Sequence, residues 1–214
     1  MVGRAEVQET EQDSKVTNRN VHIYHVYAID GWKPVVHEHL DAMYRTDLVL
    51  NLAEFHVGLV GPQRAAAAIY IQDHIPCKIA GEAEQGWEQV TLRSMWRWAQ
   101  TAEPANVLYT HTKGISRVTD ANTAWRREME TSLVLNWKDA LVDLESHDAV
   151  GCRWMTEHDH YLYGIFAGNF WWVKSETVKT FRQPFNDYRY GAEAWLGQNG
   201  IRDIVDRSAR KVLQ

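Results

Sequence analysis

The stretch "NVLYTHTKGIS" at residues 106–116 is central to the fold, because an apolar run ends there in a group of polar residues. Residues 106–110 have the length and apolar content of a buried strand. They are followed by an imidazole, a hydroxyl, an ammonium and a glycine, in His111, Thr112, Lys113 and Gly114. Such groups are costly at the exit of a buried strand unless something binds there. Backbone N–H groups beside a glycine, together with a lysine, suit an anion such as a diphosphate.

His111 has three possible roles at this strand exit. Its imidazole could ligate a metal, donate to a phosphate oxygen or contact a sugar hydroxyl. The same tetrapeptide also suits a surface turn in which the lysine is solvated and the histidine caps the strand. The residues 111–114 alone do not separate a binding turn from a surface turn.

Strands and helices alternate along the rest of the chain. Strands are expected at 21–29, 54–61, 77–80, 106–110, 148–154 and 164–174, and helices from Pro34 and at about 63–74, 88–100, 121–145 and 191–198. This alternation predicts an α/β fold with a mainly parallel sheet covered by helices on both faces. Ligands of such sheets bind beyond the carboxyl ends of the strands. Asp30, Gly61 and the turn at 111–114 are therefore expected at one rim of the sheet.

Composition limits the possible class of protein. The chain has 214 residues and a net charge of −5, which gives it no overall basic field for nucleic acid. Residues 1–20 are polar and aperiodic and are expected to be a disordered leader, followed by one domain at 21–214. No apolar run is long enough to span a membrane and no signal peptide is visible, so a cytoplasmic protein is expected.

Two later segments carry further candidate residues. In "GIFAGNFWWVKS", Gly168 and Asn169 interrupt an apolar run, which indicates a bulge or a close approach of the backbone to a ligand. Asn169 can donate to and accept from sugar hydroxyls. Trp171 and Trp172 are adjacent in a predicted strand and should face opposite ways, so at most one contacts a ligand while the other lies in the core. A tryptophan-rich central strand with a glycine bulge explains the segment equally well.

In "RYGAEAWLG" at 189–197, Glu193 could accept from amides at a helix start, or act as a general base. The histidines and acids of "EHDH" at 157–160 are a minor metal candidate, because no matching zinc motif accompanies them. The chain has no GxGxxG, GxxxxGK[ST] or GxSxG motif. Dinucleotide oxidoreductases, P-loop NTPases and α/β-hydrolases are therefore disfavoured.

Taken in order, "VLYTHTKGIS", "WRREM", "DAVGCRW", "FAGNFWWVKS" and "RYGAEAWLG" resemble a family of small bacterial and viral glycosyltransferases. The likeness covers roughly residues 21–197 and is most specific at 109–116 and 168–172. It implies a GT-A-like fold, with a Rossmann-type sheet that binds a nucleotide sugar, and transfer of a hexosyl or pentosyl group to a hydroxyl acceptor. A UDP-sugar is the expected donor, in the cytoplasm of a bacterium or a virus-infected cell.

GT-A enzymes usually hold a divalent metal with Asp-x-Asp, and this sequence contains no Asp-x-Asp. The resemblance therefore implies that Lys113 neutralises the leaving diphosphate and that His111 assists it or keeps a weaker metal site. It implies Glu193 as the base, with inversion or retention left open. The implied residues that bind donor or acceptor are Asp30, Thr112, Gly114, Gly168, Asn169, one of Trp171 and Trp172, and Arg189.

The acceptor implied by the resemblance is a cell-envelope glycan, with a hydroxymethylated pyrimidine in phage-type DNA as the other candidate. The overall acidity argues mildly against DNA, whereas Arg126, Arg127, Arg182 and Arg189 keep it open. The missing Asp-x-Asp also leaves a different class of protein possible. This is a non-catalytic module of the same fold that binds a nucleotide or a carbohydrate.

Overall fold

The computed structural model describes residues 19–156, 163–184 and 189–208. A seven-stranded sheet lies at its centre in the order β3-β2-β1-β4-β8-β5-β9. The strands of this sheet are β1 (Arg19–Tyr27), β2 (Leu52–Val60), β3 (Lys78–Ala83), β4 (Ala105–His111), β5 (Ala149–Gly151), β8 (Trp171–Lys174) and β9 (Ile204–Asp206). All of them run in one direction except β8, which is antiparallel to both of its neighbours.

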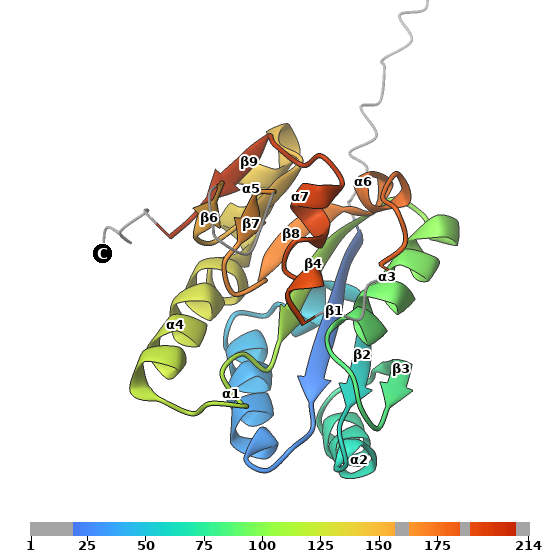
Figure 1. The fold of residues 1–214 in the computed structure, drawn as a ribbon, viewed down its shortest axis with the longest axis vertical. Helices are drawn as coiled ribbons and strands as arrows, with labels where there is room; N and C mark the ends of the chain where they lie inside the picture. The colour runs from blue at the N-terminus through green and yellow to red at the C-terminus, as the bar shows by residue number, and fades with distance from the viewer. Residues whose placement is uncertain (1–18, 157–162, 185–188, 209–214) are drawn as a thin grey trace, which may run out of the picture.

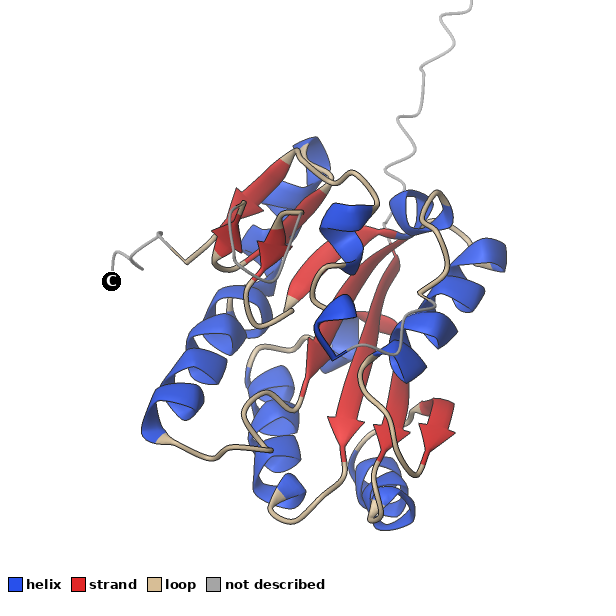
Figure 2. Ribbon diagram, viewed as in Figure 1, coloured by secondary structure: helices blue, strands red, loops and turns tan. Residues whose placement is uncertain are grey.

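Helices cover both faces of the sheet (Figures 1 and 2). The helical elements are α1 (Trp32–Arg45), η1 (Val49–Asn51), α2 (Arg64–His74), α3 (Gln89–Thr101), α4 (Asp120–Glu130), the π-helical η2 (Thr131–Leu135), α5 (Trp137–Ser146), α6 (Ser175–Lys179), η3 (Arg189–Gly191) and α7 (Trp195–Gln198). A short ribbon of β6 (Trp154–Met155) and β7 (Ile165–Phe166) lies beside the main sheet. The predicted α/β fold class, with a Rossmann-type, mainly parallel sheet flanked by helices, is confirmed.

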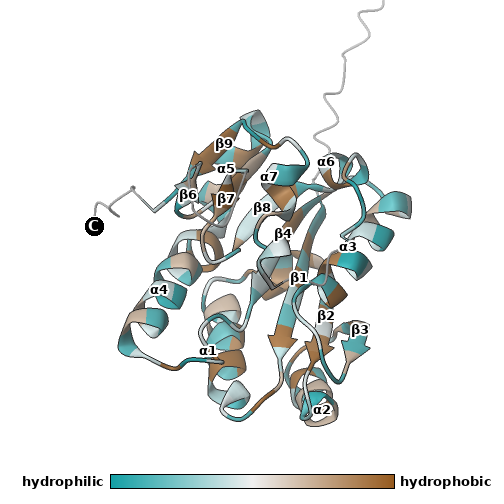
Figure 3. Ribbon diagram, in the orientation of Figure 1, coloured by the Kyte–Doolittle hydropathy of each residue, from teal (hydrophilic) through white to brown (hydrophobic). Residues whose placement is uncertain are grey.

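The side chains of β1 and β4 alternate between two apolar clusters. On one face, Tyr24 and Leu108 pack with residues of α1, α2, α4 and α5. On the other face, Ile23 and Tyr109 pack with residues of α3, α6 and α7. In Figure 3 hydrophilic and hydrophobic residues share the long helices α1, α3 and α4, as expected for helices with one side against a sheet. This alternation decides which polar residues near the strand ends face α3.

Two predicted elements are divided in the structure. The helix expected at 121–145 is α4, η2 and α5 in succession, and the indole of Trp172 donates to the carbonyl of Leu133 within the π-helical segment (2.9 Å). The strand expected at 164–174 is β7 and β8, separated by a turn in which Gly168 has φ +94° and Asn169 φ +58°. A Cβ at Gly168 would lie 2.6 Å from the sulfur of Met129, so the interruption of the apolar run marks a tight turn.

Two segments discussed in the sequence analysis lie wholly or mostly outside the described residues. Residues 1–18 of the predicted leader lie outside the described residues, while Arg19 and Asn20 already belong to β1. The "EHDH" segment at 157–160 also lies outside them. Among the helices that are described, none combines the length and apolar character needed to cross a membrane.

We expect Gly58→Ala to destabilise the protein by about 1–3 kcal/mol, the usual cost of overpacking. A Cβ on Gly58 in β2 would lie 1.9 Å from the hydroxyl oxygen of Thr91 on α3, so the helix would have to move away from the sheet. Urea denaturation monitored by circular dichroism measures the effect. Gly81→Ala on the edge strand β3 is the matched control, because its Cβ would meet the side-chain oxygen of Ser94 at 2.8 Å. An equal or smaller loss in Gly58→Ala than in Gly81→Ala would contradict this prediction.

Candidate functional site

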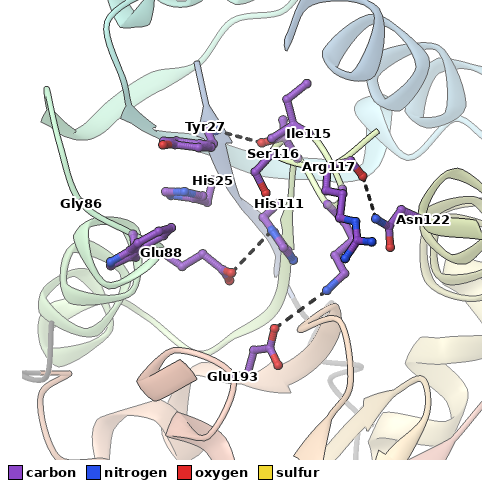
Figure 4. Close-up of a pocket in the computed structure, with 14 residues that line it drawn as sticks. His25, Tyr27, Gly86, Glu88, His111, Ile115, Ser116, Arg117, Asn122 and Glu193 are labelled. Carbon is purple, nitrogen blue, oxygen red and sulfur yellow. Dashed lines mark hydrogen bonds and ion pairs between the residues drawn. The ribbon is translucent and has the colours of Figure 1, made fainter. Parts of the chain in front are cut away.

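A cavity of about 280 Å³ lies at the carboxyl ends of β1 and β4. These strands are parallel neighbours, but the chain leaves β1 towards β2 and reaches β4 from β3, on the far side of β2. The strand order thus reverses between β1 and β4, which is where open α/β sheets bind their ligands. The walls come from three regions: the ends of β1 and β4 with the turn at 111–117, the loop before α3, and the loop before α7 (Figure 4).

The turn after β4 contributes His111, Thr112, Lys113 and Gly114 to this cavity, as the sequence predicted. Backbone hydrogen bonds fix the turn, because the N–H of Thr112 donates to the carbonyl of His25 (3.0 Å). The hydroxyl of Thr112 in turn accepts from the N–H of Tyr27 (2.8 Å). Gly114 has φ +84°, a conformation that favours glycine.

Lys113 and Glu193 meet in the cavity, although they are far apart in sequence. The Lys113 ammonium lies 3.9 Å from an oxygen of Glu193 and 4.3 Å from the ring centre of Trp125 on α4. Both side chains are mostly buried, with exposed fractions of 16% and 20%. Asn122 and the guanidinium-bearing Arg117 line the same space. The site therefore offers cationic groups beside carboxylates in a partly enclosed pocket.

His111 is a neutral imidazole of one tautomer at ordinary pH. Its Nε2 lies 2.8 Å from the carbonyl oxygen of Gly168, which can only accept, so Nε2 carries the hydrogen. Burial, reinforced by the nearby Lys113 cation, lowers the pKa of His111 to about 3. The lone pair is then on Nδ1, 3.6 Å from an oxygen of Glu88.

His25 is the second buried histidine of the cavity. Its Nδ1 lies 2.7 Å from the hydroxyl of Thr91 on α3. Burial lowers the pKa of His25 to about 4, against the opposing attraction of Glu88. Like His111, it contributes a neutral ring to the wall of the cavity.

Glu88 lines the cavity as well, although no local sequence pattern marks it. It immediately precedes α3 and lines the cavity. One carboxylate oxygen accepts hydrogen bonds from Asn169 (2.6 Å) and from the Tyr109 hydroxyl (3.0 Å). A single glutamate in a polar loop gives no local signal, because its partners come from a strand and a turn that follow it by some twenty and eighty residues.

Several predicted binding residues lie away from the cavity. Asp30 is exposed in the loop after β1, where it accepts from Gln63. Trp171 and Trp172 are both fully buried, on opposite faces of the sheet, so the predicted opposition is confirmed but neither lines the cavity. Asn169 is 1% exposed and bonds to Glu88. Gly168 contributes its carbonyl to His111. Arg189 is the first residue of η3, and its side chain lies outside the described part of the structure.

The cavity holds two neighbouring side chains that could ligate a metal. His111 and Glu88 present one nitrogen and one carboxylate oxygen, 3.6 Å apart. Among the described residues, no group of three or more histidine, cysteine or acidic side chains gathers around one point. A magnesium ion that is also bound by substrate phosphates can use as few as one or two carboxylates of the protein.

The chain belongs to the family described as Domain of unknown function (DUF8361), whose model matches residues 23–199. No curated protein matches the sequence. Among solved structures, it is similar to a 4-diphosphocytidyl-2C-methyl-D-erythritol synthase, at 13% identity over 92% of this chain and 94% of that one, with a TM-score of 0.44.

A second similar structure is described as a nucleotide-diphospho-sugar transferase from Desulfovibrio desulfuricans G20, at 10% identity over 88% of this chain and 79% of that one, again with a TM-score of 0.44. The synthase from Anaerococcus prevotii DSM 20548 gives 10% identity over 92% and 93%, also with a TM-score of 0.44. These values are too low to assign an activity to this chain.

We expect His111 to make the protein less stable in mild acid. The unfolded chain takes up a proton near pH 6.5 and the folded protein only near pH 3, so stability is lost as the pH falls below about 6.5. Urea unfolding at pH 7 and pH 5 should show a smaller acid-induced loss in His111→Asn than in the wild type. His37→Asn, on the exposed side of α1, is the matched control and should behave like the wild type. Equal losses in all three proteins would show that His111 titrates normally.

Proposed function

We propose that the protein is a glycosyltransferase that takes a sugar from a nucleoside diphosphate donor and transfers it to a hydroxyl acceptor. The observation that carries the proposal is the cavity between β1 and β4. It combines Lys113 and Arg117 with an aromatic pair and with carboxylates, at the point where the strand order reverses. Transfer from a nucleotide sugar uses cations that bind the diphosphate and a flat surface that binds the base. It also uses a group that takes the proton of the acceptor hydroxyl.

The diphosphate would bind at the turn after β4. Lys113 is a fixed cation in a partly buried pocket, where it attracts a phosphate more strongly than it would in water. Gly114, with its positive φ, lets backbone N–H groups approach an anion closely. When the bond to the sugar breaks, negative charge accumulates on the diphosphate. A cation already in place stabilises that charge at no further cost in reorganisation.

The base would bind against Tyr27 and Trp87. Their ring centres are 6.4 Å apart with an interplanar angle of 38°, and Trp87 is 40% exposed. An exposed aromatic ring at the mouth of a cavity is a stacking surface for a nucleobase. Stacking does not distinguish one base from another. A UDP-sugar is our proposed donor on the strength of the family resemblance.

The acceptor is proposed to be a glycan. Two of the four arginines that left DNA open are engaged with an acid, because Arg126 and Arg127 both bind Glu38, at 2.6 and 2.5 Å. Arg153, close to Trp125, binds Glu128. Neutralised arginines provide little attraction for a phosphate backbone. A hydroxymethylated pyrimidine in DNA is the second acceptor to be tried.

We expect Lys113→Ala to weaken binding of UDP about tenfold or more, because the diphosphate loses its nearest ammonium. A tenfold loss corresponds to about 1.4 kcal/mol. Isothermal titration calorimetry measures the affinity for UDP. Thermal unfolding in the presence of UDP-glucose, UDP-galactose or UDP-N-acetylglucosamine measures binding of the sugar nucleotides. Both measurements are made with and without manganese. Lys138→Ala on α5 is the matched control, since Lys138 lies over Trp137 away from the cavity.

The outcomes separate the candidate functions. Binding of UDP that depends on Lys113, with transfer to a glycan, supports the proposal. Binding without turnover of any donor would identify a non-catalytic nucleotide-binding module, the alternative that the missing Asp-x-Asp motif suggests. No binding of UDP or of any of these sugar nucleotides would reject both.

A further inference from the structure

The Glu88 carboxylate is held rigidly on one side and open on the other. Its Oε2 accepts from the Nδ2 of Asn169 at 2.6 Å and from the Tyr109 hydroxyl at 3.0 Å. Its Oε1 faces the cavity and lies 3.6 Å from Nδ1 of His111 (Figure 4). Two donors on one oxygen fix the plane of the carboxylate, so the direction of the other oxygen is fixed as well.

The orientation of Asn169 is unambiguous. The indole nitrogen of Trp171 can only donate, and it lies 2.7 Å from the Oδ1 of Asn169. The other end of the amide, which meets Glu88, is therefore the NH₂ group. Asn169 and Trp171 are each 1% exposed, and Trp171 belongs to β8 in the middle of the sheet. A buried and fully paired chain of this kind is rigid, and it ends at Glu88.

The neutral His111 leaves a place for a hydroxyl hydrogen beside Glu88. Because Nε2 donates to Gly168, Nδ1 presents a lone pair towards Oε1 of the carboxylate. Two acceptors that face each other are favourable only when a donor lies between them. An alcohol of an acceptor, which donates one hydrogen, suits this position.

Glu193, the base expected from the sequence, is in a different situation. It lies 3.9 Å from the Lys113 ammonium, so a fixed cation faces this carboxylate inside the cavity. The two carboxylates in the cavity therefore differ. Hydrogen bonds from Asn169 and Tyr109 orient the Glu88 carboxylate, and no lysine or arginine among the described residues forms an ion pair with it.

On the assumption that the protein transfers sugars as proposed, we infer that Glu88 is the general base and that Asn169 and Tyr109 are its positioning residues. The acceptor O–H gives its proton to Oε1 of Glu88 while its oxygen bonds to the anomeric carbon. The bond from that carbon to the diphosphate breaks, and its electron pair leaves on the nucleoside diphosphate beside Lys113. A single displacement of this kind inverts the anomeric carbon.

The test uses water as the acceptor and UDP-glucose, UDP-galactose and UDP-N-acetylglucosamine as donors. Turnover is measured as release of UDP, and the anomer of the sugar first released is read by proton NMR. We expect Glu88→Gln to lower turnover by about 100-fold or more, as loss of a general base does, with UDP affinity changed less than about twofold. Asn169→Ala should lower turnover by about tenfold, because the Glu88 carboxylate loses a hydrogen bond to Oε2 that orients it, also without loss of UDP affinity.

Glu193→Gln is the matched control, with the same chemical change in the same cavity. It should keep more turnover than Glu88→Gln, and thermal unfolding and circular dichroism confirm that both variants fold. Turnover that survives Glu88→Gln, or a product with retained configuration, would overturn this inference while leaving the proposed transferase in place. Failure of the wild-type protein to release UDP from every donor would instead overturn the proposed function, and the assignment of Glu88 with it.

Discussion

The reversal of strand order between β1 and β4 is the constraint on which the rest of the site depends. Because the two strands are parallel and adjacent, their carboxyl ends lie at one edge of the sheet. Because the strand order reverses between them, the chain continues from β1 and reaches β4 on the same side of the sheet, away from β8. The backbone of Thr112 bridges the two strand ends by donating to the carbonyl of His25. The lysine that follows is thereby directed into a cavity whose floor cannot move independently of the sheet.

The second feature is the use of buried polar groups to position an exposed one. Trp171, Asn169 and Glu88 form a chain of hydrogen bonds that runs from the centre of the sheet to the cavity. A buried amide or hydroxyl without a partner would cost free energy, so each member depends on the others for its orientation. The tight turn at Gly168 brings Asn169 under Glu88 and directs a carbonyl to His111. The tryptophan-rich segment thus acts on the site through contacts and not through direct exposure to ligand.

Several of the charged side chains in and around the cavity are paired. Lys113 lies beside Glu193, and the arginines of α4 bind Glu38. Burial keeps the rings of His25 and His111 neutral. The wall of the cavity therefore carries charged side chains next to neutral histidine rings.

The sequence by itself determined the class of fold and one wall of the site. The length and apolar content of three runs predicted the strands β1, β2 and β4. The polar residues that follow β4 predicted that residues 111–114 lie at the carboxyl end of that strand. Glu193 also reached the cavity as expected. Only the tertiary structure showed that β8 runs against its neighbours and that Trp171 and Trp172 are both buried. No local pattern marks Glu88 as a residue of the cavity, because the hydrogen bonds that orient its carboxylate come from Tyr109 and Asn169. Local patterns record which face of an element is buried, whereas contacts between distant segments depend on how the elements are brought together.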